Sequence, residues 1–187
     1  GITIVSPADS LETVKAVYAA SSARKSTYIR LTGDNNSVQL NDNDYNFQIG
    51  KAKKIIEGKK IAFLATGVSV GESKKAVEML YKKNIFCSLY NFHTIKPIDL
   101  ESLDKIASKY ELIFTIEEHN IIGGLGSAVS EVLITKKNRP KQFFMGVKDT
   151  YKNTGSYREV LEKSGISAEK IYQKVITEVK AIWKKSH

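Results

Sequence analysis

The sequence predicts an α/β fold, a three-layer α/β/α sandwich with a mostly parallel sheet. Two observations carry this prediction. First, short apolar and β-branched segments alternate along the chain with segments whose apolar residues recur at helical spacing, which is typical of βαβ units. Second, the segment IAFLAT (61–66) is apolar throughout, as strands covered on both faces are. With 187 residues, 42% of them hydrophobic, the chain can bury a substantial core.

The first expected elements are a strand over 2–5 (ITIV) and a helix directly after it. In the intervening SPAD, Ser6 is the expected N-cap, Pro7 occupies the first helical position and Asp9 lies in the first turn. A carboxylate in that turn suits the helix dipole. Leu11, Val14 and Tyr18 are predicted to share one face of this helix.

A second strand is predicted at 27–31 (TYIRL), and the best candidate for a linker follows it. Residues 32–46 are rich in Asn and Asp and have no sustained period, which indicates an irregular connection. Beyond the linker, residues 47–67 predict two strands joined at Glu57-Gly58, of which the second is IAFLAT.

The remainder of the chain continues the alternation. Strands are predicted at 86–92 (FCSLYNF), 112–117 (LIFTIE) and 142–147 (QFFMGV). Apolar residues at helical spacing predict four helices between and after these strands, and the first and third of the following sets are predicted to face inward: Ala76, Val77, Leu80 and Tyr81; Leu103, Ile106, Ala107 and Tyr110; Ala128, Val129, Val132 and Leu133; and Ile171, Val175, Val179 and Ile182.

The net charge of +9 arises from 29 Lys and Arg against 20 Asp and Glu, a balance that fits a nucleic-acid partner, an anionic substrate or a lysine-rich surface. Only four of the 29 are arginine, and the lysines form scattered pairs without interleaved aromatic residues. We therefore expect a solvated surface and no nucleic-acid partner.

The sequence also indicates a soluble, cytoplasmic protein that does not contact a membrane. No apolar run approaches the roughly 20 residues that span a bilayer, and the N-terminus lacks a signal pattern. Cys87 is the single cysteine, so no intramolecular disulfide can form. We expect its thiol to be a small buried hydrophobic group in a reducing compartment.

The segment EEHNIIGGLGSAV (117–129) places glycines between a predicted strand and a predicted helix. A dinucleotide site requires the pattern GxGxxG, but Val129 stands where the third glycine would be. We therefore interpret the glycines as a tight packing turn near an interface, with anion binding at the helix N-terminus as the alternative. ATGVSVGES (65–73) presents the same choice and receives the same interpretation.

Five segments provide a more specific signal: SPADSLETVKAVYAA followed by YIRL, KIAFLATGVSV, HTIKPID, EEHNIIGGLGSAVSEVL and GVKDTYKNTGSYREVLEKSGI. In this order and spacing they resemble the C-terminal part of the transketolase family of thiamine-diphosphate enzymes. The resemblance is strongest to transketolases that are split over two polypeptides. It implies that residues 1–46 are the tail of a pyrimidine-binding domain plus a linker, and that residues 47–187 form a transketolase C-terminal-like domain.

The resemblance further implies that the complete enzyme transfers a two-carbon ketol unit between sugar phosphates, using thiamine diphosphate and Mg²⁺. In this family the residues that activate the cofactor lie upstream of the position equivalent to Gly1, and another domain or subunit holds the diphosphate and metal. We therefore expect the chain alone to bind neither, to be inactive and to serve assembly. The missing domains or subunit are its expected partners, and the complete enzyme is an expected homodimer.

Three alternatives remain at this point. The chain could belong to a 1-deoxyxylulose-5-phosphate synthase, or it could be the C-terminal domain of a 2-oxoacid dehydrogenase β subunit. It could also be a stand-alone module that binds an anion or nucleotide at the helix N-termini after Gly67 or Gly123.

The resemblance carries over one site residue, Arg30 in YIRL, which occupies the position of an arginine that contacts the sugar-phosphate substrate. A guanidinium at the end of a strand suits bidentate phosphate binding. His93 and His119 are expected to be structural or to lie at a domain contact, and the Glu117–Glu118 pair could meet a partner subunit or be solvated. His187 receives no role, and the three histidines and one cysteine do not have zinc-ligand spacing.

Overall fold

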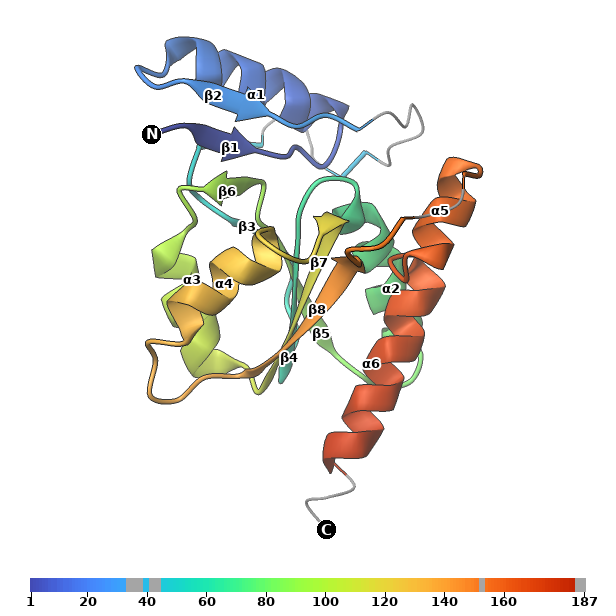
Figure 1. Ribbon diagram of the computed structural model, residues 1–187. Coiled ribbons are helices and arrows are strands. Elements are labelled where there is room, and N and C mark those ends of the chain that lie inside the picture. Colours follow the sequence, from blue (N-terminus) through green and yellow to red (C-terminus); the bar gives the residue numbers. More distant parts are fainter. Residues whose placement is uncertain (33–38, 41–44, 152–153, 184–187) are drawn as a thin grey trace.

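A computed structural model describes residues 1–32, 39–40, 45–151 and 154–183 (Figure 1). Its larger sheet has five strands in the order β3-β5-β4-β7-β8. These strands are β3 (Lys53–Ile56), β4 (Ile61–Ala65), β5 (Cys87–Asn91), β7 (Leu112–Asn120) and β8 (Lys141–Val147). All neighbouring pairs are parallel except β3 with β5. The predicted mostly parallel sheet is confirmed.

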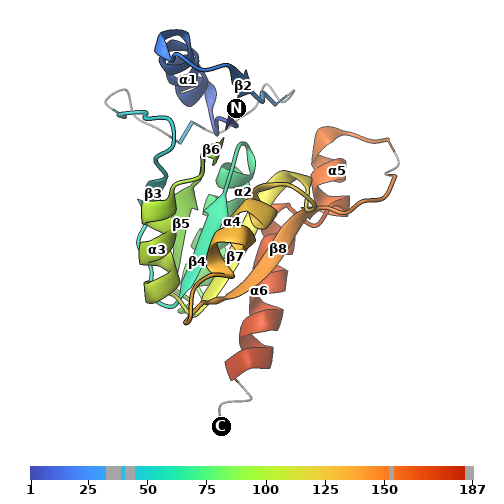
Figure 2. The ribbon, with the colours of Figure 1, turned by 60° about the vertical axis from the view of Figure 1, so that its left-hand side comes forward.

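Helices cover both faces of this sheet, which confirms the three-layer sandwich (Figures 1 and 2). One layer contains α3 (Leu100–Lys109) and α4 (Leu125–Leu133). The other contains α2 (Ser69–Tyr81) and α6 (Ala168–Trp183), with the short α5 (Tyr157–Lys163) near their upper end. Helix α5, which was not predicted, begins with a capping box between Ser156 and Glu159.

The central strand β4 shows why a fully apolar segment was the correct signal. Its residues alternate between two separate core clusters. Phe63 packs in the cluster on the α2 and α6 side, whereas Leu64 packs in the cluster on the α3 and α4 side. Both side chains are 0% exposed, as expected for a strand covered on both faces.

A smaller sheet joins the N-terminal segment to the rest of the chain. It has the order β2-β1-β6, where β1 is Thr3–Val5, β2 is Thr27–Ile29 and β6 is Thr94–Lys96. Strand β1 pairs in parallel with β2 and antiparallel with β6, and α1 (Ser10–Ser22) lies beside it in Figure 1. Strand β6 was not predicted, and it comes from the segment that follows β5.

The predicted start of the first helix is wrong. Helix α1 begins at Ser10, and its N-cap is Asp9, whose carboxylate accepts the backbone N–H of Glu12 at 2.7 Å. Ser6 does not cap the helix, because it lies four residues before Ser10 and its backbone bonds to segments that follow β5 and β4. Its N–H donates to His93 O at 2.7 Å and its carbonyl accepts the N–H of Gly67 at 3.2 Å.

The apolar face predicted for α1 from Leu11, Val14 and Tyr18 is not the buried face of the helix. Val14 and Tyr18 are 52% and 72% exposed, whereas Glu12 and Ala16 are fully buried. The helix therefore turns a partly polar face toward the rest of the chain and presents apolar side chains outward. Tyr81 was predicted to face inward, but it is 64% exposed at the end of α2.

The other predicted helical faces are largely confirmed. Side chains of α2, α3 and α6 fill the cores, and in α4 Val129 and Leu133 are buried while Ala128 and Val132 are partly exposed. The two strands joined at Glu57-Gly58 both form, but they are not neighbours, because β3 pairs with β5 at the sheet edge.

The predicted linker lies mostly outside the described residues. No helix within the described ranges has the length and apolar character to cross a membrane.

Candidate functional site

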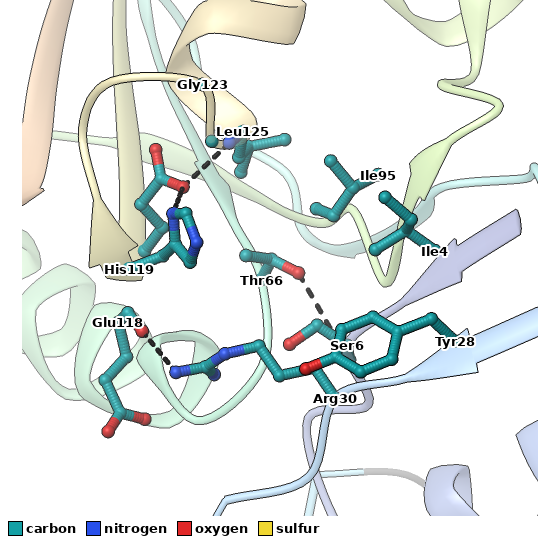
Figure 3. A pocket seen from close by; sticks show the side chains of 12 residues that line it. Ile4, Ser6, Tyr28, Arg30, Thr66, Ile95, Glu118, His119, Gly123 and Leu125 are labelled. Atoms are coloured by element: carbon teal, nitrogen blue, oxygen red, sulfur yellow. Dashed lines mark hydrogen bonds and ion pairs between the residues drawn. The ribbon is translucent and has the colours of Figure 1, made fainter. Parts of the chain in front are cut away.

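A cavity of about 200 Å³ lies between the small sheet and the carboxyl ends of β4 and β7 (Figure 3). Ligand sites of parallel α/β sheets usually occupy this edge. The small sheet and its flanks contribute Ile4, Ser6, Tyr28, Arg30 and Ile95, and the edge of the larger sheet contributes Thr66, Glu117, Glu118, His119, Gly123, Gly124 and Leu125.

Arg30, the residue singled out in the sequence, lines this cavity. Its backbone N–H donates to Val5 O at 2.8 Å, which anchors the residue just beyond β2. Its side chain reaches across to the larger sheet, where Nη2 donates to the backbone carbonyl of Glu118 at 2.6 Å. The guanidinium is therefore oriented by a main-chain group and retains further N–H donors on its planar fork. Its role in substrate binding remains a prediction.

Glu117 caps helix α4 from the end of β7. Its carboxylate accepts the backbone N–H of Leu125 at 2.7 Å and that of Gly126 at 2.9 Å. Burial raises the pKa of this carboxyl above its usual range, although these N–H groups and the charges of His119 and Arg30 act in the opposite direction. The helix N-terminus thus already holds an anionic side chain of the protein itself.

This arrangement explains the glycines of the turn. Gly123 has a φ of +74°, which favours glycine. A Cβ on Gly124 would lie 1.9 Å from Glu117 Oε2, and one on Gly126 would lie 2.3 Å from Phe144 Cδ1. The interpretation as a packing turn is confirmed, and its position near an interface stays a prediction.

The other glycine turn, after β4, also makes a close packing contact. Gly67 has a φ of +58°, and a Cβ there would lie 2.7 Å from Ser6 Oγ. The turn thereby joins the N-terminal segment to the larger sheet.

His119 and Glu118 also line the cavity. The His119 side chain is 49% exposed and its Nδ1 lies 3.9 Å from Glu117 Oε2. The same nitrogen is 2.8 Å from Asn120 O, and since a carbonyl only accepts, Nδ1 carries the proton. The Glu118 carboxylate turns instead to α5, where Oε2 accepts the hydroxyl of Tyr157 at 3.0 Å.

His93 is not part of the cavity. It is buried and packs against Phe47, with ring centroids 4.4 Å apart and ring planes tilted by 36°, and burial lowers the pKa of its imidazole to about 4. Cys87 is buried as expected, and burial raises the pKa of its thiol to about 12. Within the described part of the chain, no group of three or more His, Cys, Asp or Glu could hold a metal ion.

A match to a known family places this geometry in context. A family model for the transketolase C-terminal domain matches residues 50–171. The chain belongs to the transketolase C-terminal domain family. The resemblance stated from the sequence is therefore confirmed, and the cavity lies where this C-terminal domain meets the N-terminal segment.

Individual relatives agree with the family match. The chain is 31% identical over 180 residues to a putative transketolase C-terminal section from Methanocaldococcus jannaschii, covering 96% of this chain and 56% of that protein. It is 29% identical over 179 residues to 1-deoxy-D-xylulose-5-phosphate synthase from Dehalococcoides mccartyi, covering 94% and 28% respectively. The chain thus spans about half, or less, of the length of these curated relatives.

A solved structure described as a split gene transketolase, an inactive β4 tetramer, has the same fold. It superposes with a TM-score of 0.83 at 29% identity, covering 94% of this chain and 56% of that one. The fold of the transketolase C-terminal section therefore extends over nearly the whole chain, including the N-terminal segment that carries Arg30.

A second polar cluster, which the sequence analysis missed, joins α1 to the transketolase C-terminal domain. The Glu12 carboxylate is fully buried. It accepts the N–H of Ala8 at 2.7 Å, the hydroxyl of Tyr45 at 2.9 Å and two contacts from Asn91 Nδ2 at 2.9 and 3.0 Å. Burial raises the pKa of this carboxyl, with the hydrogen bonds acting in the opposite direction. A glutamate on a surface helix is normally solvated, so only the fold reveals this role.

Proposed function

We propose that this chain is the C-terminal section of a transketolase-type enzyme that transfers a two-carbon ketol unit between sugar phosphates. The observation that carries the proposal is the position of the Arg30 guanidinium. It lines the cavity at the carboxyl ends of β4 and β7, held by the Glu118 carbonyl at 2.6 Å. A planar guanidinium in such a cavity can bind a phosphate through two parallel N–H donors. The substrate phosphate is the group that this chain would hold.

The two sheets support a division of the chain into two parts. Residues 1–46 would be the tail of a pyrimidine-binding domain plus a linker, and residues 47–187 the C-terminal domain. Val14, Tyr18 and Leu31 are 52%, 72% and 58% exposed on the N-terminal part, and β2 pairs on one side only among the described strands. An apolar surface beside an open sheet edge suits coverage by the remainder of such a domain.

The described residues do not themselves fit thiamine diphosphate and Mg²⁺. They include no cluster of metal-binding side chains, and the N–H groups that begin α4 already donate to Glu117. Cofactor and metal would therefore be held by the partner region, where the cofactor supplies the electron sink for the two-carbon unit. The part of this chain would be to bind and orient the phosphate end of the substrate.

We also propose that the chain is inactive alone and that the complete enzyme is a cytoplasmic homodimer. The split-gene relative is described as an inactive β4 tetramer, which supports the first point. The single buried cysteine fits a reducing compartment.

A second candidate is 1-deoxyxylulose-5-phosphate synthase, favoured by the relative from Dehalococcoides mccartyi. The two candidates differ in their product, which the name of the synthase gives as 1-deoxy-D-xylulose 5-phosphate. Product analysis of the complete enzyme separates them, and formation of 1-deoxyxylulose 5-phosphate without ketol transfer between sugar phosphates would overturn the first proposal.

Arg30→Ala in the complete enzyme tests the site. Loss of a charge-assisted contact of about 1.5–3 kcal/mol predicts roughly a ten- to hundredfold higher KM for phosphorylated acceptors. The KM for unphosphorylated acceptors should change little. Arg158→Ala, at an exposed position of α5, is the matched control. An equal loss on both kinds of acceptor would reject the phosphate role of Arg30.

A further inference from the structure

Glu118 contacts Arg30 through its backbone but not through its carboxylate. Figure 3 shows the dashed contact from the guanidinium to the Glu118 carbonyl, and among the described residues no ion pair joins Arg30 to a carboxylate. The Glu118 carboxylate belongs to the very residue whose carbonyl Arg30 touches, so a rotation of one side chain could bring the two charges together. Such a pair would occupy the donors that a phosphate needs.

The other acidic residue of the cavity is not free to compete in this way. Both oxygens of Glu117 accept N–H groups of α4, at 2.7 and 2.9 Å, and the side chain is only 3% exposed. Glu118 is therefore the carboxylate of the cavity lining whose position decides whether Arg30 remains open.

A hydroxyl group from another element sets that position. Tyr157, the first residue of α5, donates its hydroxyl to Glu118 Oε2 at 3.0 Å. The two residues are 39 positions apart in sequence, so this contact exists only because α5 packs near the end of β7. A hydrogen bond to an ionised carboxylate is stronger than one between neutral groups, which makes the tyrosine an effective anchor.

We propose that Tyr157 is a positioning residue that keeps Arg30 available to an anionic substrate group by holding the Glu118 carboxylate on α5. The proposal rests on the phosphate-binding role of Arg30 proposed above. The carboxylate and a phosphate compete for the same N–H donors, because an internal carboxylate paired with the guanidinium must be displaced before a phosphate binds. Tyr157 removes that competitor without neutralising Arg30.

Tyr157→Phe in the complete enzyme tests the proposal, because it keeps the ring and removes only the hydroxyl. Partly exposed ion pairs are typically worth a few tenths to one kcal/mol, so the apparent KM for phosphorylated acceptors should rise roughly two- to sixfold. The KM for unphosphorylated acceptors and kcat should not change. Tyr172→Phe, on α6, is the matched control for loss of a phenolic hydroxyl.

A second substitution separates competition from a general structural defect. Adding Glu118→Gln to Tyr157→Phe should restore the original KM, because a neutral amide does not pair with the guanidinium as a carboxylate does. A rise in KM that persists in the double variant would overturn the competition argument. An unchanged KM in the single variant would overturn it as well.

A crystal structure of the Tyr157→Phe chain provides a readout that does not depend on activity. We expect a Glu118 carboxylate oxygen within 4 Å of the Arg30 guanidinium, and a carboxylate that stays on α5 would contradict the inference. The Arg30→Ala result distinguishes the two levels of failure. If Arg30→Ala raises both KM values equally, the proposed function fails. If it acts selectively and Tyr157→Phe has no effect, only the role of Tyr157 fails.

Discussion

Glu12→Ala should uncouple the N-terminal segment from the larger sheet. The carboxylate is the shared acceptor for three donors, which are the Ala8 N–H, the Tyr45 hydroxyl and the Asn91 amide. Glu12 and Asn91 are 0% exposed and Tyr45 is 9% exposed, so water cannot readily replace the lost oxygen atoms. The substitution therefore leaves buried donors without an acceptor.

The size of the effect follows from these contacts. Each buried donor left unsatisfied costs about 1–3 kcal/mol, which gives a gross loss of several kcal/mol for three donors. Removing a buried carboxylate offsets part of this, because its raised pKa indicates that burial disfavours the charged form. The higher helix propensity of alanine offsets a further few tenths of a kcal/mol. We expect a net loss of about 3 kcal/mol in the free energy of unfolding.

Urea denaturation followed by circular dichroism measures this loss. With an m-value of about 2 kcal/mol/M, the midpoint should fall by about 1.5 M. Hydrogen exchange should locate the effect, with the amides of α1 losing protection before those of β4 and β7. The matched control is Glu78→Ala, at an exposed position of α2, which should change stability by no more than about 0.5 kcal/mol.

Equal stabilities of Glu12→Ala and Glu78→Ala would refute the reasoning. A double-mutant cycle with Asn91→Ala sharpens the test. The two side chains share two contacts, at 2.9 and 3.0 Å, so we expect a coupling energy of about 0.5–3 kcal/mol. Strict additivity would mean that the contact contributes nothing to stability.

Three further predictions concern the turn, a histidine and the cysteine. Gly124→Ala should cost more than about 2 kcal/mol in urea denaturation because a Cβ would lie 1.9 Å from Glu117 Oε2, whereas Gly123→Ala, which meets only the strain of its φ of +74°, should cost about 1 kcal/mol. Equal costs would contradict this. Burial lowers the pKa of His93 to about 4, so the folded state favours the neutral imidazole. The contribution of His93 to the free energy of unfolding is therefore present above about pH 6.5 and should fall by about 3 kcal/mol as the pH drops to 4. The stability difference between the wild type and His93→Gln should follow this fall, and a constant difference would exclude it. Burial raises the pKa of the Cys87 thiol to about 12, so a thiol reagent at pH 8 should modify it only after unfolding, and rapid labelling of the folded chain would contradict the buried position.

Local patterns in the sequence determined most of the fold. Alternating apolar segments located the five-stranded core except for exact strand ends, and the continuous apolar run IAFLAT identified the central strand. These features are predictable because a strand buried on both faces needs apolar side chains at every position. Arg30 and the family were also accessible from the sequence, through a resemblance of motifs and not through periodicity.

Tertiary structure alone decided which polar groups meet. Glu12 and Asn91 are 79 residues apart in sequence, and Arg30 and Glu118 are 88 apart, so no local pattern could pair them. The start of α1 also involves distant residues, since the backbone of Ser6 forms hydrogen bonds with His93 and Gly67, and Asp9 is the N-cap of the helix. Hydrophobic periodicity is a property of neighbouring residues and can be recognised directly in the sequence. The partner of a buried charge comes from a distant element that packs beside it. Such a partner is required because desolvation penalises a buried charged group that has no partner.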